Sequence, residues 1–200
     1  MFLDDVKHDD QDLETWQQYY QKTLARSHHP RTEKAASQVV ASTNLAIDCG
    51  CGTGADIAFL ASMGYQVIGF DSHDKAVDIC QKRFEYEPSV MVHELSFEDF
   101  SYPMASLIIA NSSLFFAKPG EFYLTWLKLS SSLERGGVFA GDFMGLKDDW
   151  VKSHSGSITA LSKAQVMMLF EVFDVIEFHE RDDGGKTQLG EEKHWHVFSV

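Results

Sequence analysis

At 200 residues, 44% of them hydrophobic, the chain is long enough to bury one sizeable core and too short for two ordinary domains. Its 30 acidic residues against 17 lysines and arginines give a formal net charge of -13, which repels the phosphate backbone of nucleic acids. We therefore expect a single domain over residues 1–200 and no nucleic-acid partner.

Neither a membrane span nor a secretion signal is apparent in the sequence. The longest apolar runs, such as residues 105–110, are far shorter than the roughly 20 residues that cross a bilayer. The first ten residues are acidic, whereas a secretory signal begins with basic and then apolar residues. We expect a soluble, cytoplasmic protein with no membrane partner.

The first predicted element is a helix over residues 12–26. Its apolar and aromatic side chains are spaced three or four residues apart, as on one helical face. They are Leu13, Trp16, Tyr19, Tyr20 and Leu24. This helix makes residues 1–40 a predicted N-terminal helical cap on a core formed by residues 41–200.

Beyond the cap, short β-rich runs alternate with helical stretches, a pattern typical of a parallel sheet. The predicted strands cover residues 45–49, 66–70, 90–95, 105–110, 136–142, 172–182 and 192–199. The predicted helices cover residues 54–63, 73–86, 119–134 and 159–170. A hairpin turn signal at residues 182–185 makes the last two strands antiparallel. The predicted fold is therefore an α/β Rossmann-like three-layer sandwich, with a seven-stranded mostly parallel sheet and a C-terminal antiparallel hairpin.

Three glycines at alternate positions, Gly50, Gly52 and Gly54, follow the first predicted strand and precede a helix. Glycine lets the backbone approach a ligand without a β-carbon, and the helix start offers unpaired N–H groups. This turn is a predicted cofactor site. The glycines alone leave the cofactor open, because Gly50, Gly52 and Ala55 also satisfy the relaxed pattern of nicotinamide dinucleotide binders.

Two aspartates add to the glycine turn. Asp71 ends the second strand, where its carboxylate can accept hydrogen bonds from both hydroxyls of a ribose. Asp48 precedes the first glycine by two residues, where it would repel a pyrophosphate and favour a cationic ligand. The cation of S-adenosylmethionine (SAM) fits this position.

The stretch Asp48-x-Gly50-x-Gly52-x-Gly54, with Asp71 after a strand, resembles the signature of class I SAM-dependent methyltransferases. The resemblance implies that the glycine turn lines the methionine part of SAM. It also implies that Asp71 and Ser72 bind the ribose and that the residues after the third strand flank the adenine. Within that last segment, Phe97 or Glu98 is the implied adenine contact.

The resemblance extends over nearly the whole chain. Residues 107–150 and the closing residues 193–196 look like bacterial methyltransferases grouped with tellurite-resistance and thiopurine-type small-molecule enzymes. In that group the N-terminal helix closes over the cofactor, which makes Trp16, Tyr19 and Tyr20 candidates for a lid. Arg26 becomes a candidate partner of the methionine carboxylate. The alternative is that the aromatic face of the helix simply packs on the sheet.

The residues after the fourth and fifth strands face the methyl acceptor, since ligands bind beyond the carboxyl ends of parallel strands. These are the segments that begin at Asn111 and Asp142. Asp142 or a nearby histidine is the candidate general base if the acceptor is a protonated amine or hydroxyl. Asn111 is a second candidate for catalysis or cofactor binding. Methyltransferases of DNA amino groups carry an Asn/Asp-Pro-Pro-aromatic motif here, but Asn111 is followed by two serines.

No metal site is expected. The three cysteines include no CxxC pair, and we expect them to be small apolar core residues. His194 and His196 fall on one face of a strand, but the sequence shows no third ligand.

We therefore expect SAM-dependent methyl transfer to a small-molecule acceptor by direct displacement, with S-adenosylhomocysteine as product and the protein a monomer or homodimer. Two alternatives stay open. One is a non-catalytic module that binds SAM or a nucleotide. The other is a nicotinamide-dependent oxidoreductase, against which Asp48 and the lack of a catalytic Tyr-Lys or His arrangement both count.

Overall fold

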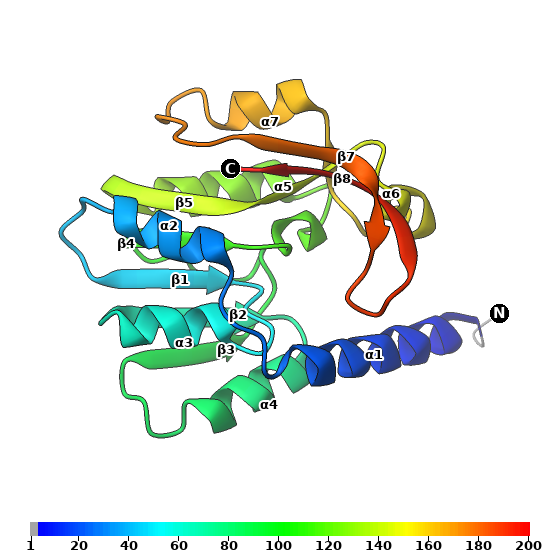
Figure 1. The fold of residues 1–200 in the computed structure, drawn as a ribbon, viewed down its shortest axis with the longest axis horizontal. Coiled ribbons are helices and arrows are strands. Elements are labelled where there is room, and N and C mark those ends of the chain that lie inside the picture. Colours follow the sequence, from blue (N-terminus) through cyan, green and yellow to red (C-terminus); the bar gives the residue numbers. More distant parts are fainter. Residues whose placement is uncertain (1–3) are drawn as a thin grey trace.

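A computed structural model describes residues 4–200, with side chains from Glu14 onward. The first three residues of the predicted cap and the side chain of Leu13 lie outside this description. The helices are α1 (Asp4–Thr23), α2 (Pro30–Gln38), α3 (Ala55–Ser62), α4 (Asp74–Arg83), the 3-10 turn η1 (Leu114–Phe116), α5 (Phe122–Ser131), α6 (Asp149–Ser153) and α7 (Lys163–Leu169). The strands are β1 (Leu45–Cys49), β2 (Gln66–Asp71), β3 (Val90–Glu94), β4 (Ala105–Ala110), β5 (Leu133–Gly145), β6 (Ala160–Leu161), β7 (His179–Lys186) and β8 (Glu192–Ser199) (Figure 1).

The strands form one mostly parallel sheet in the order β3-β2-β1-β4-β5-β8-β7. Strands β1 to β5 pair in parallel, whereas β8 is antiparallel to both β5 and β7. The predicted Rossmann-like fold with a closing antiparallel hairpin is confirmed. The predicted count of seven strands is corrected to eight among the described residues, because β6 pairs with the end of β5. A strand of two residues is too short to show a hydrophobic period.

Each face of the sheet is covered by helices, which gives three layers. Side chains alternate along a strand, so neighbouring residues of β1 belong to different cores. Ala46 packs in the core that includes residues of α2, α3 and α4. Ile47 packs in the core that includes the aromatic side chains of α5. Because β2 and β4 flank β1 on opposite sides, the order of the strands reverses at β1, and a ligand crevice opens beyond its carboxyl end.

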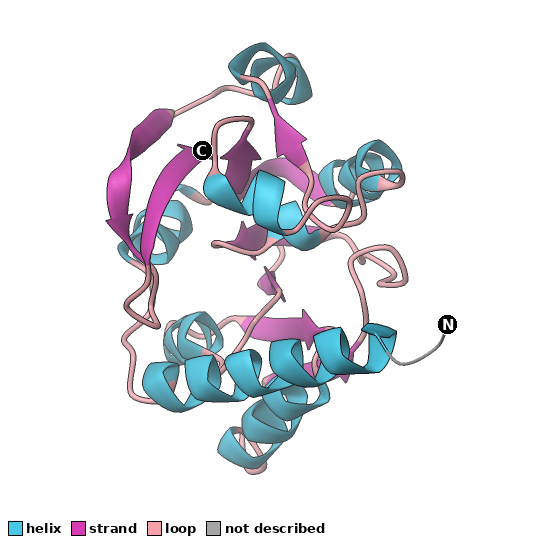
Figure 2. Ribbon diagram, turned by 90° about the vertical axis from the view of Figure 1, so that its right-hand side faces the viewer, coloured by secondary structure: helices cyan, strands magenta, loops and turns pink. Residues whose placement is uncertain are grey.

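Helix α1 crosses this edge of the molecule, as Figure 2 shows. The Trp16 ring lies 4.9 Å from the His73 ring, after β2, and 5.5 Å from the Phe116 ring, after β4. The N-terminal helix therefore covers the carboxyl ends of these strands. None of the helices described is long and apolar enough to cross a membrane.

The predicted hairpin turn at residues 182–185 is wrong. Those residues lie inside β7, where Asp182 is the register partner of His196 and Gly185 that of Lys193. The chain turns at residues 187–191 instead, where the Thr187 N–H donates to the Glu191 carbonyl at 2.8 Å. Gly190 supplies the left-handed residue of this turn with a φ of 93°, whereas Gly184 and Gly185 lack the positive φ that a tight turn needs.

A buried ion pair fastens the hairpin to the end of β5. The Lys193 ammonium donates to the Asp148 carboxylate, and the two side chains are 3% and 0% exposed. The ammonium also lies over two indole rings, 4.3 Å from the centroid of Trp150 and 3.6 Å from that of Trp195. Asp148 accepts a further hydrogen bond from the His196 backbone N–H at 3.0 Å, so its charge is compensated from several directions.

We predict that Lys193→Ala lowers the free energy of unfolding by about 3–5 kcal/mol, because it leaves Asp148 as a buried carboxylate without its cation. Urea unfolding followed by circular dichroism measures the change. Lys163→Ala is the matched control, since it breaks the exposed pair with Glu180 on the same hairpin and should shift the midpoint far less. Equal losses in the two variants would contradict the importance given to burial.

Candidate functional site

The three glycines form a tight loop at the point where the strand order reverses. Gly50, Gly52 and Gly54 all have positive φ, of 70°, 53° and 76°. A β-carbon on Gly50 would lie 2.6 Å from the Cβ of Ser113, and one on Gly54 would lie 2.9 Å from the Cys80 thiol. A β-carbon on Gly52 would meet nothing within 4 Å. The two ends of the loop are thus packed against Ser113 and Cys80, while its centre, at Gly52, faces open space that a ligand can fill.

Asp71 stands at the end of β2, directly beside this loop. It is 8% exposed, and its two carboxylate oxygens accept backbone N–H groups of Gly52 and His73, each at 3.0 Å. Burial raises the pKa of Asp71, and these N–H groups offset part of the increase. A carboxylate offers roughly four lone pairs, so Asp71 can still accept hydrogen bonds from ligand hydroxyls.

Asp48, near the end of β1, is the least compensated acid of the site. Its side chain is buried, with the residue 3% exposed, and burial raises its pKa well above the usual range. The nearby carboxylates of Asp56 and Asp71 raise the pKa further, and no described group donates a hydrogen bond that would lower it. The described residues therefore do not stabilise the charged form of Asp48.

The predicted adenine segment follows β3 and divides into two parts. Phe97 lies against the glycine loop, 3.7 Å from the position of a β-carbon on Gly50. Glu98 is buried, and its carboxylate accepts the Lys118 backbone N–H at 2.7 Å, so it fixes the loop that follows η1. Ser72 is exposed and directly follows Asp71 in the chain. Phe97 and Ser72 are therefore better placed than Glu98 for a ligand contact.

The aromatic residues of α1 come together over the loop. Tyr20 is buried, and burial is the main cause of the raised pKa of its phenol. The nearby Asp71 carboxylate raises this pKa further. Trp16 bridges His73 and Phe116, and its ring lies 5.9 Å from that of Tyr20. This placement is compatible with both expectations for α1, a lid over the cofactor and an aromatic face packed on the sheet.

Arg26 lies just beyond the end of α1 and is exposed. Its guanidinium lies close enough to Tyr19 to lower the pKa of that phenol, against the larger effect of burial, which raises it. The structure thus puts a cation at the rim of the covered region, and its pairing with a methionine carboxylate stays a prediction.

Asn111, directly after β4, and Asp142, inside the carboxyl end of β5 and not after it, lie together, but their polar atoms are already bound. The Arg31 guanidinium donates to Asn111 Oδ1 at 3.0 Å and to Asp142 Oδ1 at 2.8 Å. Asp142 Oδ1 also accepts from the Ser199 hydroxyl, and Oδ2 accepts the Ser112 backbone N–H at 2.8 Å. An ion pair and three further hydrogen bonds hold the Asp142 carboxylate, and its role as a general base stays a prediction.

The sequence analysis missed the residues that hold this network, above all Arg31 and Asp56. Arg31 lies in the first turn of α2, a helix that was not among the predicted elements. Asp56 reaches from α3, and its Oδ1 accepts the His29 backbone N–H and the Thr32 hydroxyl, both at 2.8 Å. Pro30 at the start of α2 was the signal for this helix. No local pattern pointed to the role of Arg31.

Three possible metal ligands, Glu180, Asp182 and His196, gather on the hairpin. The Nδ1 atom of His196 accepts the Lys147 backbone N–H at 3.1 Å, so the proton of a neutral ring lies on Nε2, which faces Glu180 at 3.3 Å. Asp182 is paired with the Lys147 ammonium. These contacts form a hydrogen-bonded cluster, and the absence of a resident metal stays a prediction.

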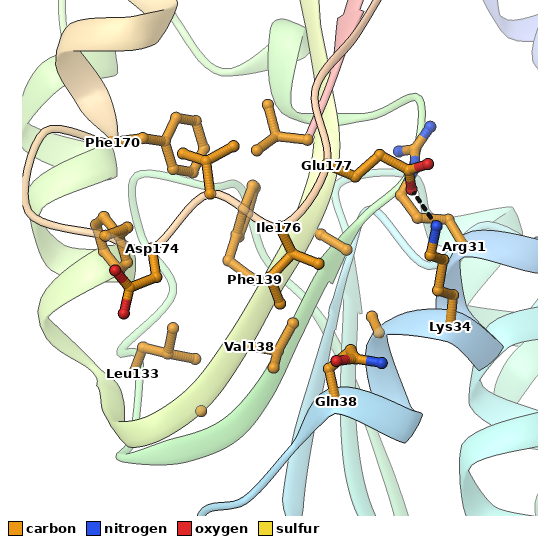
Figure 3. A pocket seen from close by; sticks show the side chains of 16 residues that line it. Arg31, Lys34, Gln38, Leu133, Val138, Phe139, Phe170, Asp174, Ile176 and Glu177 are labelled. Carbon is orange, nitrogen blue, oxygen red and sulfur yellow. Dashed lines mark hydrogen bonds and ion pairs between the residues drawn. The ribbon is translucent and has the colours of Figure 1, made fainter.

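A groove lies between α2, β5 and residues 170–177 (Figure 3). Its wall is largely apolar, with Phe139, Phe170 and Ile176, and the exposed pair Lys34–Glu177 spans it at 2.8 Å. Of the network above, only Arg31 reaches it, at one end. The predicted cofactor residues do not line this groove.

The glycine loop at the reversal of the strand order, with an acid at the end of β1 and another at the end of β2, resembles the site of class I SAM-dependent methyltransferases. Residues 46–137 match the family described as a methyltransferase domain. The resemblance predicted from the sequence is confirmed. No curated protein matches the chain.

Among solved structures, the chain is similar to TehB from Haemophilus influenzae, with 15% identity and a TM-score of 0.69. The match covers 90% of this chain and 64% of that one, so the chain spans less than two thirds of that TehB. It is also similar to the N-methyltransferase NodS from Bradyrhizobium japonicum WM9 in complex with S-adenosylhomocysteine, with 16% identity, a TM-score of 0.61 and coverage of 91% and 96%. A third similar structure is geranyl diphosphate C-methyltransferase from Streptomyces coelicolor A3(2), with 14% identity, a TM-score of 0.58 and coverage of 75% and 60%. At these identities the likeness establishes the fold.

We predict that Asp48→Asn stabilises the ligand-free protein. The pKa of Asp48 is raised on folding, so the folded state loses stability as pH rises above the usual aspartate pKa of about 3.9. The variant should therefore have the larger free energy of unfolding at about pH 8, and the gain should shrink toward about pH 4. Urea titrations at both pH values measure it, with the exposed Asp78→Asn on α4 as control. A gain independent of pH would show that the charge of Asp48 is not its cause.

Proposed function

We propose that this chain binds SAM at the carboxyl edge of its sheet and transfers the methyl group to a small-molecule acceptor. The observation that carries the proposal is Asp48, a buried carboxylate to which no described group donates a hydrogen bond, beside a glycine loop whose centre faces open space. A cationic ligand on this loop would relieve the cost of burying the charge. A pyrophosphate cofactor would increase it.

The residues around the loop fit the parts of SAM. When bound, SAM supplies an electrophilic methyl group on a sulfonium, with an ammonium and a carboxylate at the methionine end. Asp48 would attract the cationic part, Asp71 with Ser72 would accept the ribose hydroxyls, and Phe97 would contact the adenine. Arg26 would bind the methionine carboxylate.

Positioning explains catalysis here better than proton transfer. Direct displacement at a sulfonium needs the nucleophile, the methyl carbon and the sulfur in line, and alignment alone supplies a large part of the rate. Because the Asp142 carboxylate is held by Arg31, Ser112 and Ser199, we infer an acceptor that reaches the site already nucleophilic, such as a thiolate or another chalcogen anion. The net charge of -13 argues against nucleic acid as the acceptor.

Titration calorimetry tests the cofactor. We predict binding of SAM and S-adenosylhomocysteine and no binding of NADH. Asp71→Ala should weaken SAM binding by about 1–3 kcal/mol through loss of charge-assisted hydrogen bonds. The control is Asp78→Ala, an exposed acid on α4 that should leave the affinity unchanged.

Two outcomes would overturn this assignment. NADH binding without SAM binding would indicate a nicotinamide enzyme, and an Asp71→Ala variant of unchanged affinity would show that the ribose lies elsewhere. Methyl transfer is then measured as S-adenosylhomocysteine released with thiol, tellurite, halide and amine acceptors. SAM binding without turnover on any acceptor would favour a non-catalytic binding module.

A further inference from the structure

Arg31 connects the ends of three strands from a position in α2. One guanidinium nitrogen donates to Asn111, after β4, and the other donates both to Asp142 in β5 and to Ser199 in β8. The side chains of Arg31 and Asp142 are 18% and 6% exposed, so solvent screens this ion pair only partly. A planar guanidinium can make these contacts at once, whereas an ammonium binds as a single point.

The second oxygen of Asp142 holds a strained residue. Among the non-glycine residues described, Ser112 alone has a positive φ, of 53°. Its backbone N–H donates to Asp142 Oδ2 at 2.8 Å, and its hydroxyl lies 3.3 Å from the same oxygen. A serine in this region is costly and persists where the surroundings impose it.

The segment that begins at Ser112 rests on the glycine loop. The hydroxyl of Ser113 donates to the Cys49 carbonyl at 2.6 Å, and its Cβ lies against Gly50. The same segment ends at Phe116, which contacts Trp16 of α1. Its conformation therefore sets how the glycine loop lies relative to the aromatic residues on the acceptor side.

The amide of Asn111 is fixed in one orientation. Its oxygen accepts from Arg31, while its nitrogen donates to the Thr32 hydroxyl at 2.9 Å and to Asp56 Oδ2 at 3.0 Å. Turning the amide over would place donors against donors. Asn111 is thus held as firmly as Asp142, and both belong to the same network.

We propose that Arg31 is a positioning residue, which through Asp142 and Asn111 holds residues 111–116 against the glycine loop. The proposal rests on the function proposed above, since the loop it positions is the SAM site. It assigns Asp142 and Asn111 to positioning in place of direct contact with the acceptor. Neither residue gains or loses a proton in this role.

The test combines Arg31→Lys with Ser112→Gly. Arg31→Lys keeps the positive charge but loses the planar guanidinium that donates to several partners at once. Amide hydrogen exchange in residues 111–117 should therefore become roughly tenfold faster or more. S-adenosylhomocysteine should bind roughly tenfold more weakly. Glycine removes the cost of positive φ at position 112. The double variant should therefore recover most of the affinity that Arg31→Lys loses, with Ser112→Gly alone as its reference. The control is Lys34→Ala. Lys34 lies on the same helix as Arg31, and the substitution breaks only its exposed pair with Glu177.

Exchange and affinity unchanged in Arg31→Lys would overturn the proposal. So would faster exchange spread evenly over the chain without rescue by Ser112→Gly, because that pattern marks a general loss of stability. The exchange measurement needs no ligand. If the wild-type protein binds neither SAM nor S-adenosylhomocysteine, the proposed function fails while the exchange arm still decides whether Arg31 orders residues 111–117.

Discussion

The contact between the glycine loop and Ser113 is the constraint on which the site depends. Gly50 leaves no room for a β-carbon because Ser113 lies against it, and the Ser113 hydroxyl ties the segment after β4 to the last carbonyl of β1. The glycine loop and the segment after β4 therefore cannot shift independently of each other. Contacts that hold Ser112 and Ser113 therefore also hold the glycine loop. Helix α2 lies outside the predicted site but contributes to these contacts, because its Arg31 binds Asp142, which accepts the Ser112 N–H.

The same edge of the sheet concentrates negative charge that folding alone would not favour. Asp48 and Asp71 both have raised pKa values because burial disfavours their charged forms, and only Asp71 has N–H groups that reduce the effect. Backbone N–H groups compensate Asp71 and Arg31 compensates Asp142, whereas no described group donates a hydrogen bond to Asp48. Uncompensated charge at one position among compensated neighbours is typical of a functional site, where stability is given up for binding.

The sequence was sufficient for the parallel core, the glycine loop and its two acids, since strand periodicity and glycine spacing are local signals. It failed where structure depends on distant residues. Gly184 and Gly185 resembled a turn, yet pairing with β8 keeps them extended and moves the turn to Gly190. Nothing near Asp142 in the sequence shows that Arg31, 111 residues away, binds it. A polar contact of that separation leaves no trace in a single sequence.

The antiparallel hairpin does more than close the sheet. Its pairing register sets Ser199 opposite Asp142, so the hydroxyl of β8 donates to the carboxylate that holds Ser112. At the other end of β8, the Asp148–Lys193 pair fixes that register, because a slip of one residue would turn Ser199 away from Asp142 and Lys193 away from Asp148 together. The buried pair and the site are thus linked through one strand. The last strand of the fold thereby supports the segment on the acceptor side.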